Sequence, residues 1–184
     1  MRTTAVSATA SAPGCAGAPE RKHDRKPNRT IRGMRFAEFQ PGQVIEGGPY
    51  LVSEEEVLRY AQAFDPQWFH TDKALAEKGR FQGLIASGWH TCGIAMRLAA
   101  EAALTGSESF ASPGASYVKW PNPVRPGDRL TLRATVIEPR RARSQATLGL
   151  LRWRWQLFNQ HGAEVLDLEV TSLFDLPRLQ SPVA

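Results

Sequence analysis

A carboxylate and an imidazole lie five residues apart in the segment Asp65–His70. An aspartate and a histidine that share one water form a competent acid–base pair for moving protons to and from a substrate. The residues between them include Pro66, Trp68 and Phe69, which are stiff or bulky and could hold both polar side chains toward one cavity. Burial against the two aromatic rings would raise the pKa of Asp65 toward neutrality. Asp65 and His70 are therefore candidate catalytic residues.

The same pair also has a structural interpretation. An aspartate before a proline is common in turns, where its carboxylate accepts a hydrogen bond from nearby backbone. A histidine near the start of a helix can be a capping or surface residue. The spacing of Asp65 and His70 alone leaves both interpretations open.

A second candidate feature is Gly88, which follows Ser87 at the start of an alanine-rich apolar segment. The first N–H groups of a helix have no intrahelical acceptor and lie at the positive end of the helix dipole. A thioester carbonyl that gains negative charge in a transition state would be stabilised there, and glycine has no side chain to block its approach. Glycine and serine are also ordinary helix caps, so this signal is weak by itself.

Three helices are expected around these residues, over 53–64, 72–78 and 88–104. The first begins with a capping box formed by Ser53 and Glu56, and Pro66 disfavours helix beyond it. Thr71 could cap the second helix. The third has so few polar residues that it must be buried nearly all round.

The remaining pattern predicts strands over 50–52, 115–120, 129–136, 144–159 and 163–176. Residues 129–136 alternate polar and apolar side chains, which is typical of a half-buried strand. A single buried helix needs a sheet that wraps it. The expected fold class is α+β, with a curved antiparallel sheet around one long central helix and an overhanging helical segment. We expect one domain over residues 34–177 and a tail over 178–184.

The net charge of +5 belongs to the N-terminal segment rather than to the predicted domain. Residues 1–33 hold seven basic and two acidic residues, whereas the rest of the chain holds sixteen of each. A nucleic-acid-binding face needs basic residues clustered on the folded domain, so no nucleic-acid partner is expected. Residues 1–33 are expected to be a disordered basic leader. A later start at Met34 and a transit peptide are the alternatives.

The two cysteines, Cys15 and Cys92, form neither a disulfide framework nor a zinc-ligand spacing. This composition fits a reducing cytoplasm. No stretch approaches the roughly 18 consecutive apolar residues of a membrane helix, so no membrane association is expected.

Three segments in the right order resemble the MaoC-like (R)-specific enoyl-CoA hydratase/dehydratase family, which has the hot-dog fold. The segments are Asp65–His70, Gly83–Gly88 and the connector Pro121–Asp128. The resemblance implies that Asp65 and His70 activate a water that adds to C3 of a 2-enoyl thioester and deliver a proton to C2, or run the reverse dehydration. It implies that the Gly88 N–H polarises the thioester carbonyl. It also implies an acyl-CoA substrate, a homodimer, and no metal or redox cofactor.

The chain departs from the family pattern inside these segments. Gln67 and Trp68 stand where the family usually has Asn-Pro, and Ser87 stands where it often has histidine. A family serine further along the helix falls near Met96, which cannot donate a hydrogen bond. Gln67, Trp68 and Ser87 are therefore candidate substrate-binding residues: Gln67 can supply an amide, and Trp68 is expected to narrow or reshape the pocket. These departures bear on substrate identity more than on reaction type.

Other functions and sites remain as alternatives. A hot-dog thioesterase and a non-catalytic acyl-thioester binding protein would share the fold. Metal binding by His70, Asp72 and His90 would lack a recognised ligand spacing. The arginines of segment 140–143 form either a solvated hairpin tip or a contact to coenzyme A phosphates, which arginine recognises well.

Overall fold

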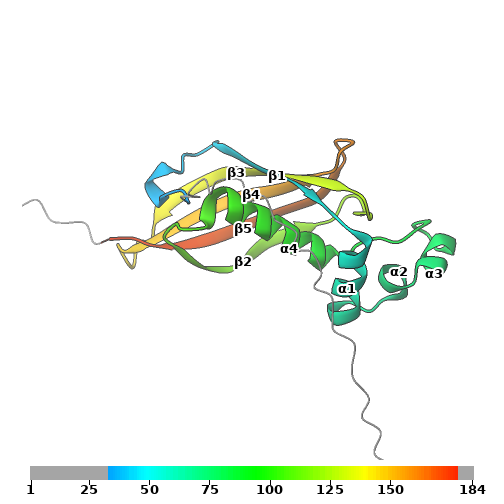
Figure 1. Cartoon of the computed structure of the whole chain (residues 1–184). Coiled ribbons are helices and arrows are strands. Elements are labelled where there is room, and N and C mark those ends of the chain that lie inside the picture. Colours follow the sequence, from blue (N-terminus) through cyan, green and yellow to red (C-terminus); the bar gives the residue numbers. More distant parts are fainter. Residues whose placement is uncertain (1–32, 178–184) are drawn as a thin grey trace, which may run out of the picture.

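The computed structural model describes residues 33–177, and the predicted leader up to residue 32 and the tail from residue 178 lie outside the described residues. The elements in chain order are η1 (Phe36–Glu38), β1 (Val44–Leu51), α1 (Glu54–Phe64), α2 (Trp68–Thr71), α3 (Lys73–Lys78), α4 (Gly88–Ala99), η2 (Ala100–Leu104), β2 (Ser109–Lys119), β3 (Arg129–Arg141), β4 (Leu148–Phe158) and β5 (Glu164–Asp175). In Figure 1, α4 lies across the sheet, and α1, α2 and α3 gather at one end of the molecule.

The strands form one five-stranded antiparallel sheet in the order β1-β3-β4-β5-β2. Buried and less buried residues alternate along β3 and β4, because successive side chains of a strand point to opposite faces. Val136, Trp153 and Val170 lie opposite one another on neighbouring strands, and Trp153 is completely buried. The prediction of a curved antiparallel sheet with one long helix is confirmed.

Helix α4 packs one face against the sheet and leaves another face exposed. Ile94 and Leu98 are buried in the core. Trp89 and Met96 lie on the other side of the helix, and 60% and 46% of their surface is exposed. The prediction that this helix is buried nearly all round is therefore wrong. Composition misled here because apolar residues also occupy the outward face.

Strands β1 and β2 are longer than predicted. Strand β1 covers Val44–Leu51 rather than residues 50–52. Strand β2 begins at Ser109, six residues before the predicted start at residue 115, in a segment that contains Pro113. The segment does pair with β5, but with repeated register shifts, and proline is tolerated in strands chiefly at sheet edges and bulges. Between residues 33 and 177, no helix is long and apolar enough to span a membrane.

Helix α1 begins where the sequence predicts. The Ser53 Oγ accepts a hydrogen bond from the Glu56 N–H at 3.1 Å. The return half of the capping box is replaced, because the Glu56 carboxylate contacts Tyr50 and His90 instead. The helix ends immediately before Asp65, the residue that precedes proline.

The helix predicted over 72–78 is present as α3, and the short helix α2, which the sequence did not predict, precedes it. Asp72, rather than Thr71, caps α3, since its side chain accepts from the Leu75 N–H at 3.0 Å. The Thr71 hydroxyl donates to the Gln67 carbonyl at 3.1 Å and so closes α2. His70 therefore lies inside a helical turn rather than ahead of one.

Candidate active site

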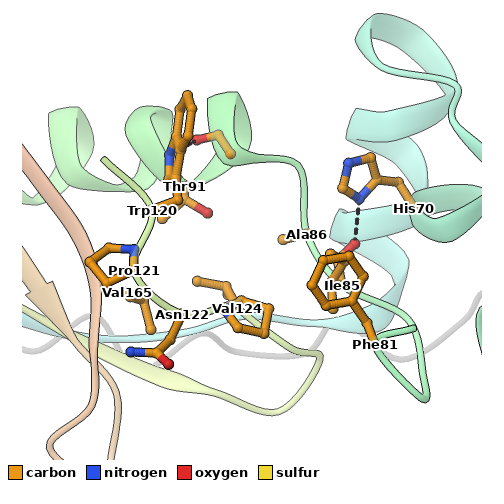
Figure 2. A pocket seen from close by; sticks show the side chains of 12 residues that line it. His70, Phe81, Ile85, Ala86, Thr91, Trp120, Pro121, Asn122, Val124 and Val165 are labelled. Carbon is orange, nitrogen blue, oxygen red and sulfur yellow. Dashed lines mark hydrogen bonds between the residues drawn. The ribbon is translucent and has the colours of Figure 1, made fainter. Parts of the chain in front are cut away.

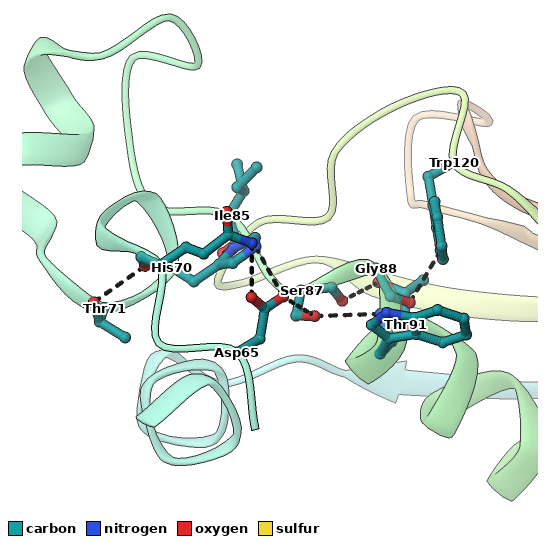
Figure 3. A network of polar contacts seen from close by, with 10 residues as sticks. Asp65, His70, Thr71, Ile85, Ser87, Gly88, Thr91 and Trp120 are labelled. Atoms are coloured by element: carbon teal, nitrogen blue, oxygen red, sulfur yellow. Dashed lines mark hydrogen bonds and ion pairs between the residues drawn. The ribbon is translucent and has the colours of Figure 1, made fainter. Parts of the chain in front are cut away.

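Asp65 lies in the turn between α1 and α2 with both carboxylate oxygens hydrogen-bonded. Its Oδ1 accepts from Gln67 Nε2 at 2.7 Å, and its Oδ2 accepts from Ser87 Oγ at 2.6 Å. The Asp65 N–H donates to the Ala61 carbonyl at 2.9 Å, so the last turn of α1 fixes its backbone. Figure 3 shows the carboxylate of Asp65 between Ser87 and His70.

These hydrogen bonds determine the charge of Asp65. The bond from Ser87 first, and the bond from Gln67 second, lower the pKa of Asp65 below its ordinary value, against a smaller opposing effect of burial. A hydrogen bond to a carboxylate favours its ionised form. The prediction that burial against aromatic rings raises this pKa is therefore wrong, because polar donors face the carboxylate.

His70 is buried, with 5% of its surface exposed, and its two ring nitrogens have different neighbours. Nδ1 lies 2.8 Å from the carbonyl oxygen of Ile85. Because a carbonyl only accepts, Nδ1 carries a proton. Nε2 lies 3.4 Å from Asp65 Oδ2. In the neutral ring Nε2 is an acceptor that faces a second acceptor, so the two groups together can accept hydrogen bonds from both O–H groups of one water.

Gly88 is the first residue of α4, so its N–H has no intrahelical acceptor. Ser87 caps the helix by accepting from the Trp89 N–H at 3.3 Å. The indole of Trp120 lies against Gly88: its Nε1 donates to the Gly88 carbonyl at 3.0 Å, and a ring atom lies 2.6 Å from the place that a Cβ would occupy. Contact with this ring therefore requires glycine here.

His70 and Gly88 line a cavity of about 210 Å³. Its other lining residues are mostly apolar and are Phe81, Ile85, Ala86, Thr91, Trp120, Pro121, Asn122, Pro123, Val124 and Val165. Figure 2 shows His70 on one side of the cavity and Thr91 and Trp120 on the other. An apolar cavity with a few polar groups is typical of a small-molecule site.

The structure brings together four of the six candidate residues, Asp65, His70, Ser87 and Gly88. Of these, His70 and Gly88 line the cavity, whereas Asp65 and Ser87 are not among its lining residues. Gln67 lies beside Asp65 through its hydrogen bond and does not line the cavity either. Trp68 is about half exposed and its ring packs over Gly79. The tryptophan that lines this cavity is Trp120.

Sequence reasoning missed Trp120 and Thr91 as cavity residues. Trp120 stands directly before the proline-rich connector, so the resemblance of that connector was a usable signal. Thr91 lies one helical turn after Gly88 on the same face of α4, and its hydroxyl donates to the Ser87 carbonyl at 3.2 Å. Phe81 and Asn122 carried no such signal.

The structure also bears on two of the alternative sites. The arginines at 140 and 141 end β3, and no residue of β3 lines the cavity. A contact between these arginines and a ligand in the cavity is therefore not supported within one chain. Among residues 33–177, no three metal-ligating side chains come together, so His70, Asp72 and His90 do not form a cluster.

A family model described as "MaoC like domain" matches residues 17–150. The chain belongs to the MaoC-like dehydratase family. The resemblance predicted from three short segments is confirmed, and at the level of the family this protein is a hydratase/dehydratase.

This MaoC-like dehydratase is 34% identical over 140 residues to the "Uncharacterized protein YdeM" of Bacillus subtilis, a match that covers 76% of this chain and 98% of that protein. The crystal structure of the MaoC-like dehydratase from Rhodospirillum rubrum is 30% identical with a TM-score of 0.74, covering 80% of this chain and 100% of that one. The unliganded R-hydratase PhaJ1 from Pseudomonas aeruginosa is 21% identical with a TM-score of 0.65, covering 84% and 97%. This last match supports the hot-dog fold alone, and that prediction is confirmed.

Proposed function

We propose that this MaoC-like dehydratase catalyses the reversible hydration of a 2-enoyl-CoA to a 3-hydroxyacyl-CoA. The observation that carries the proposal is the separation of 3.4 Å between Asp65 Oδ2 and His70 Nε2, with each group fixed by another partner. The Gly88 N–H at the start of α4 borders the same cavity as His70. An acid–base pair beside a polarising N–H is what addition of water to an enoyl thioester needs.

In the hydration direction, ionised Asp65 and neutral His70 each accept a hydrogen bond from one O–H group of a water and turn its oxygen toward C3. As the bond from oxygen to C3 forms, one proton passes to the pair. The electron pair of the double bond moves toward the thioester carbonyl, and the Gly88 N–H and the positive end of α4 stabilise the resulting enolate oxygen. The pair then returns a proton to C2, which completes the 3-hydroxyacyl thioester. Dehydration follows the same steps in reverse.

The thioester itself makes C2 acidic, so the proposed reaction uses no metal or redox cofactor. The cavity is lined mostly by apolar side chains, which suits the acyl group of a thioester. Coenzyme A is the proposed carrier, and we expect a cytoplasmic location from the cysteine content.

We also propose that two copies of the chain pair through α4 and β2. Strand β2 is an edge of the sheet and most of its residues are exposed, and an unpaired edge can accept another strand. Trp89 and Trp120 touch each other and are 60% and 42% exposed. Met96 and Phe110 border one shallow depression and are 46% and 60% exposed. Large apolar side chains gathered on one face are typical of an interface.

The direct test is hydration of crotonyl-CoA, followed as loss of enoyl absorbance, with longer enoyl-CoA substrates beside it. Asp65→Asn preserves the size of the side chain but removes the base, and we expect it to lower kcat by about 10²- to 10⁴-fold. Glu77→Gln removes an exposed carboxylate on α3 and is the matched control. Equal inactivity of the wild type and Asp65→Asn on every chain length would refute the proposal.

The same assay separates the two rival functions. A thioesterase would direct the water to the carbonyl carbon, and the release of free thiol from acyl-CoA would identify it. A non-catalytic binding protein would bind acyl-CoA without turnover, and His70→Ala would leave that binding unchanged.

A further inference from the structure

A second carboxylate–imidazole pair lies on a different face of α4 from the cavity described above. Glu56 Oε1 lies 2.9 Å from His90 Nε2 and accepts from the Tyr50 hydroxyl at 2.5 Å. His90 is 5% exposed, and its ring stacks on Tyr60 with 4.6 Å between centroids and 9° between planes. We call Tyr50, Glu56 and His90 the α1–α4 clamp. His90 does not line the cavity of His70 and Gly88.

The α1–α4 clamp joins three separate elements, since its residues come from β1, α1 and α4. Glu56 lies in the first turn of α1, and Asp65 follows the last turn. Asp65 is bonded to Ser87, which lies one turn before His90. Helix α1 is therefore tied to the start of α4 at both of its ends. Because an eleven-residue helix moves as a rigid rod, a tilt of its first turn displaces Asp65 at the other end.

The other packing contacts of α1 are apolar. Val57 and Ala61 are buried and Leu58 packs against the core, and none of these side chains gives a directional contact. Lys73 on α3 contacts Glu54 at 2.8 Å, but both side chains are largely exposed, and exposed pairs contribute little. The directional contacts at the N-terminal end of α1 are thus those of the clamp.

The charges within the clamp agree with a holding role. Burial raises the pKa of Glu56, but hydrogen bonds from Tyr50 and His90 outweigh this effect and lower it overall, so the carboxylate is ionised. His90 Nδ1 is buried and has no hydrogen-bond partner among the described residues. A proton on Nε2 leaves a lone pair at Nδ1 rather than an unmade N–H bond. His90 then donates a charge-assisted hydrogen bond to Glu56, which is stronger than a neutral one.

We propose that His90 is a positioning residue: through Glu56 it holds α1 at the tilt that keeps Asp65 beside His70 Nε2. The catalytic consequence rests on the function proposed above. The mechanical part does not, because it concerns only where α1 and the Asp65 turn lie. Neither His90 nor Glu56 lines the cavity, and their hydrogen bonds described above are to each other and to Tyr50 rather than to Asp65 or His70.

Kinetics of two substitutions at one position test the catalytic consequence. His90→Leu removes the donor and keeps an apolar side chain, whereas His90→Gln keeps a donor that can reach Glu56. We expect His90→Leu to lower kcat by about 10- to 100-fold with KM changed less than about twofold, because a small misplacement of a reacting group is costly. His90→Gln should recover most of this loss. Glu54→Gln breaks the exposed pair on the same helix and should leave kcat unchanged.

Hydrogen exchange on the full chain without substrate tests the mechanical part separately. In His90→Leu, the amides of Gln67, His70 and Asp72 should exchange about tenfold faster or more, while amides shared by β4 and β5 keep their wild-type rates. Unchanged exchange around Asp65 would overturn the proposal, and so would a loss of kcat that His90→Gln does not reverse. A wild type without hydratase activity would refute the proposed function, and the exchange rates would still decide the role of His90.

A third variant guards against misfolding of His90→Leu. Tyr50→Phe removes only the hydroxyl that donates to Glu56. It should raise exchange around Asp65 in the same direction by a smaller factor. Wild-type exchange in Tyr50→Phe, together with an unfolded His90→Leu, would assign His90 to core packing and overturn the proposal.

Discussion

At the scale of single residues, the candidate site consists of two acceptors that are fixed by different neighbours. His70 is held by the Ile85 carbonyl through Nδ1, which leaves Nε2 directed toward Asp65. Asp65 is held by Ser87 and Gln67. Ser87 is 1% exposed and its hydroxyl is used by Asp65. The serine at position 87, where the family often has histidine, therefore affects the charge of Asp65.

Replacing this serine should change the pH dependence of the reaction. Ser87→Ala removes the largest effect that lowers the pKa of Asp65, so the pKa of Asp65 rises toward its ordinary value. Hydration needs ionised Asp65 as well as neutral His70, so the rate falls when either group is protonated. The part of the acidic limb of the profile of kcat/KM against pH in which Asp65 becomes protonated should therefore move to higher pH.

The control for this profile is Ser144→Ala, which removes an exposed hydroxyl in the turn between β3 and β4. Its acidic limb should coincide with that of the wild type. An acidic limb that stays in place in Ser87→Ala would contradict the role given to Ser87.

At the scale of elements, patterns in the sequence predicted those helices and strands that interactions between nearby residues determine. The start of α1 was predicted because Ser53 caps it within three residues, and β3 was predicted because its side chains alternate. The sequence did not indicate that Asp72, rather than Thr71, caps α3. Both residue types cap helices, and which of them does so depends on how α2 folds. The contact between Trp120 and Gly88 spans 32 positions, and no local pattern in the sequence records it.

That contact makes a prediction about the start of α4. An alanine at position 88 would place its Cβ 2.6 Å from the Trp120 ring, so either the ring or the helix start must shift. We expect Gly88→Ala to lower the free energy of unfolding by about 1–3 kcal/mol, as overpacking does, and to lower the hydration rate. Adding Trp120→Ala should recover part of the stability, because it removes the collision. Urea unfolding of both variants measures this.

Gly93→Ala is the matched control, because a Cβ at Gly93 meets nothing within 4 Å. Alanine there should be neutral or stabilising by up to about 1 kcal/mol, as in other helix interiors. Wild-type stability of Gly88→Ala would show that the Trp120 ring gives way without cost.

At the scale of the whole molecule, the site lies where the overhang of α1 to α3, the start of α4 and the connector after β2 meet (Figure 1). Strand β2 forms one edge of the sheet and is followed directly by Trp120. Trp120 contacts both Trp89 and Gly88. A second copy seated on α4 and β2 would therefore also border the cavity. Assembly and activity are expected to change together for this reason.

The proposed interface predicts which edge of the sheet controls assembly. Phe110 lies on β2 and is 60% exposed, and Leu51 lies on β1, at the opposite edge, and is 58% exposed. Phe110→Glu places a charge on the proposed interface, where an unpaired buried charge is strongly unfavourable, so sedimentation should shift from dimer to monomer and the hydration rate should fall. Leu51→Glu adds the same charge at the other edge and should remain dimeric. Dissociation by Leu51→Glu but not by Phe110→Glu would place the interface on β1, and a monomeric wild type would exclude the dimer altogether.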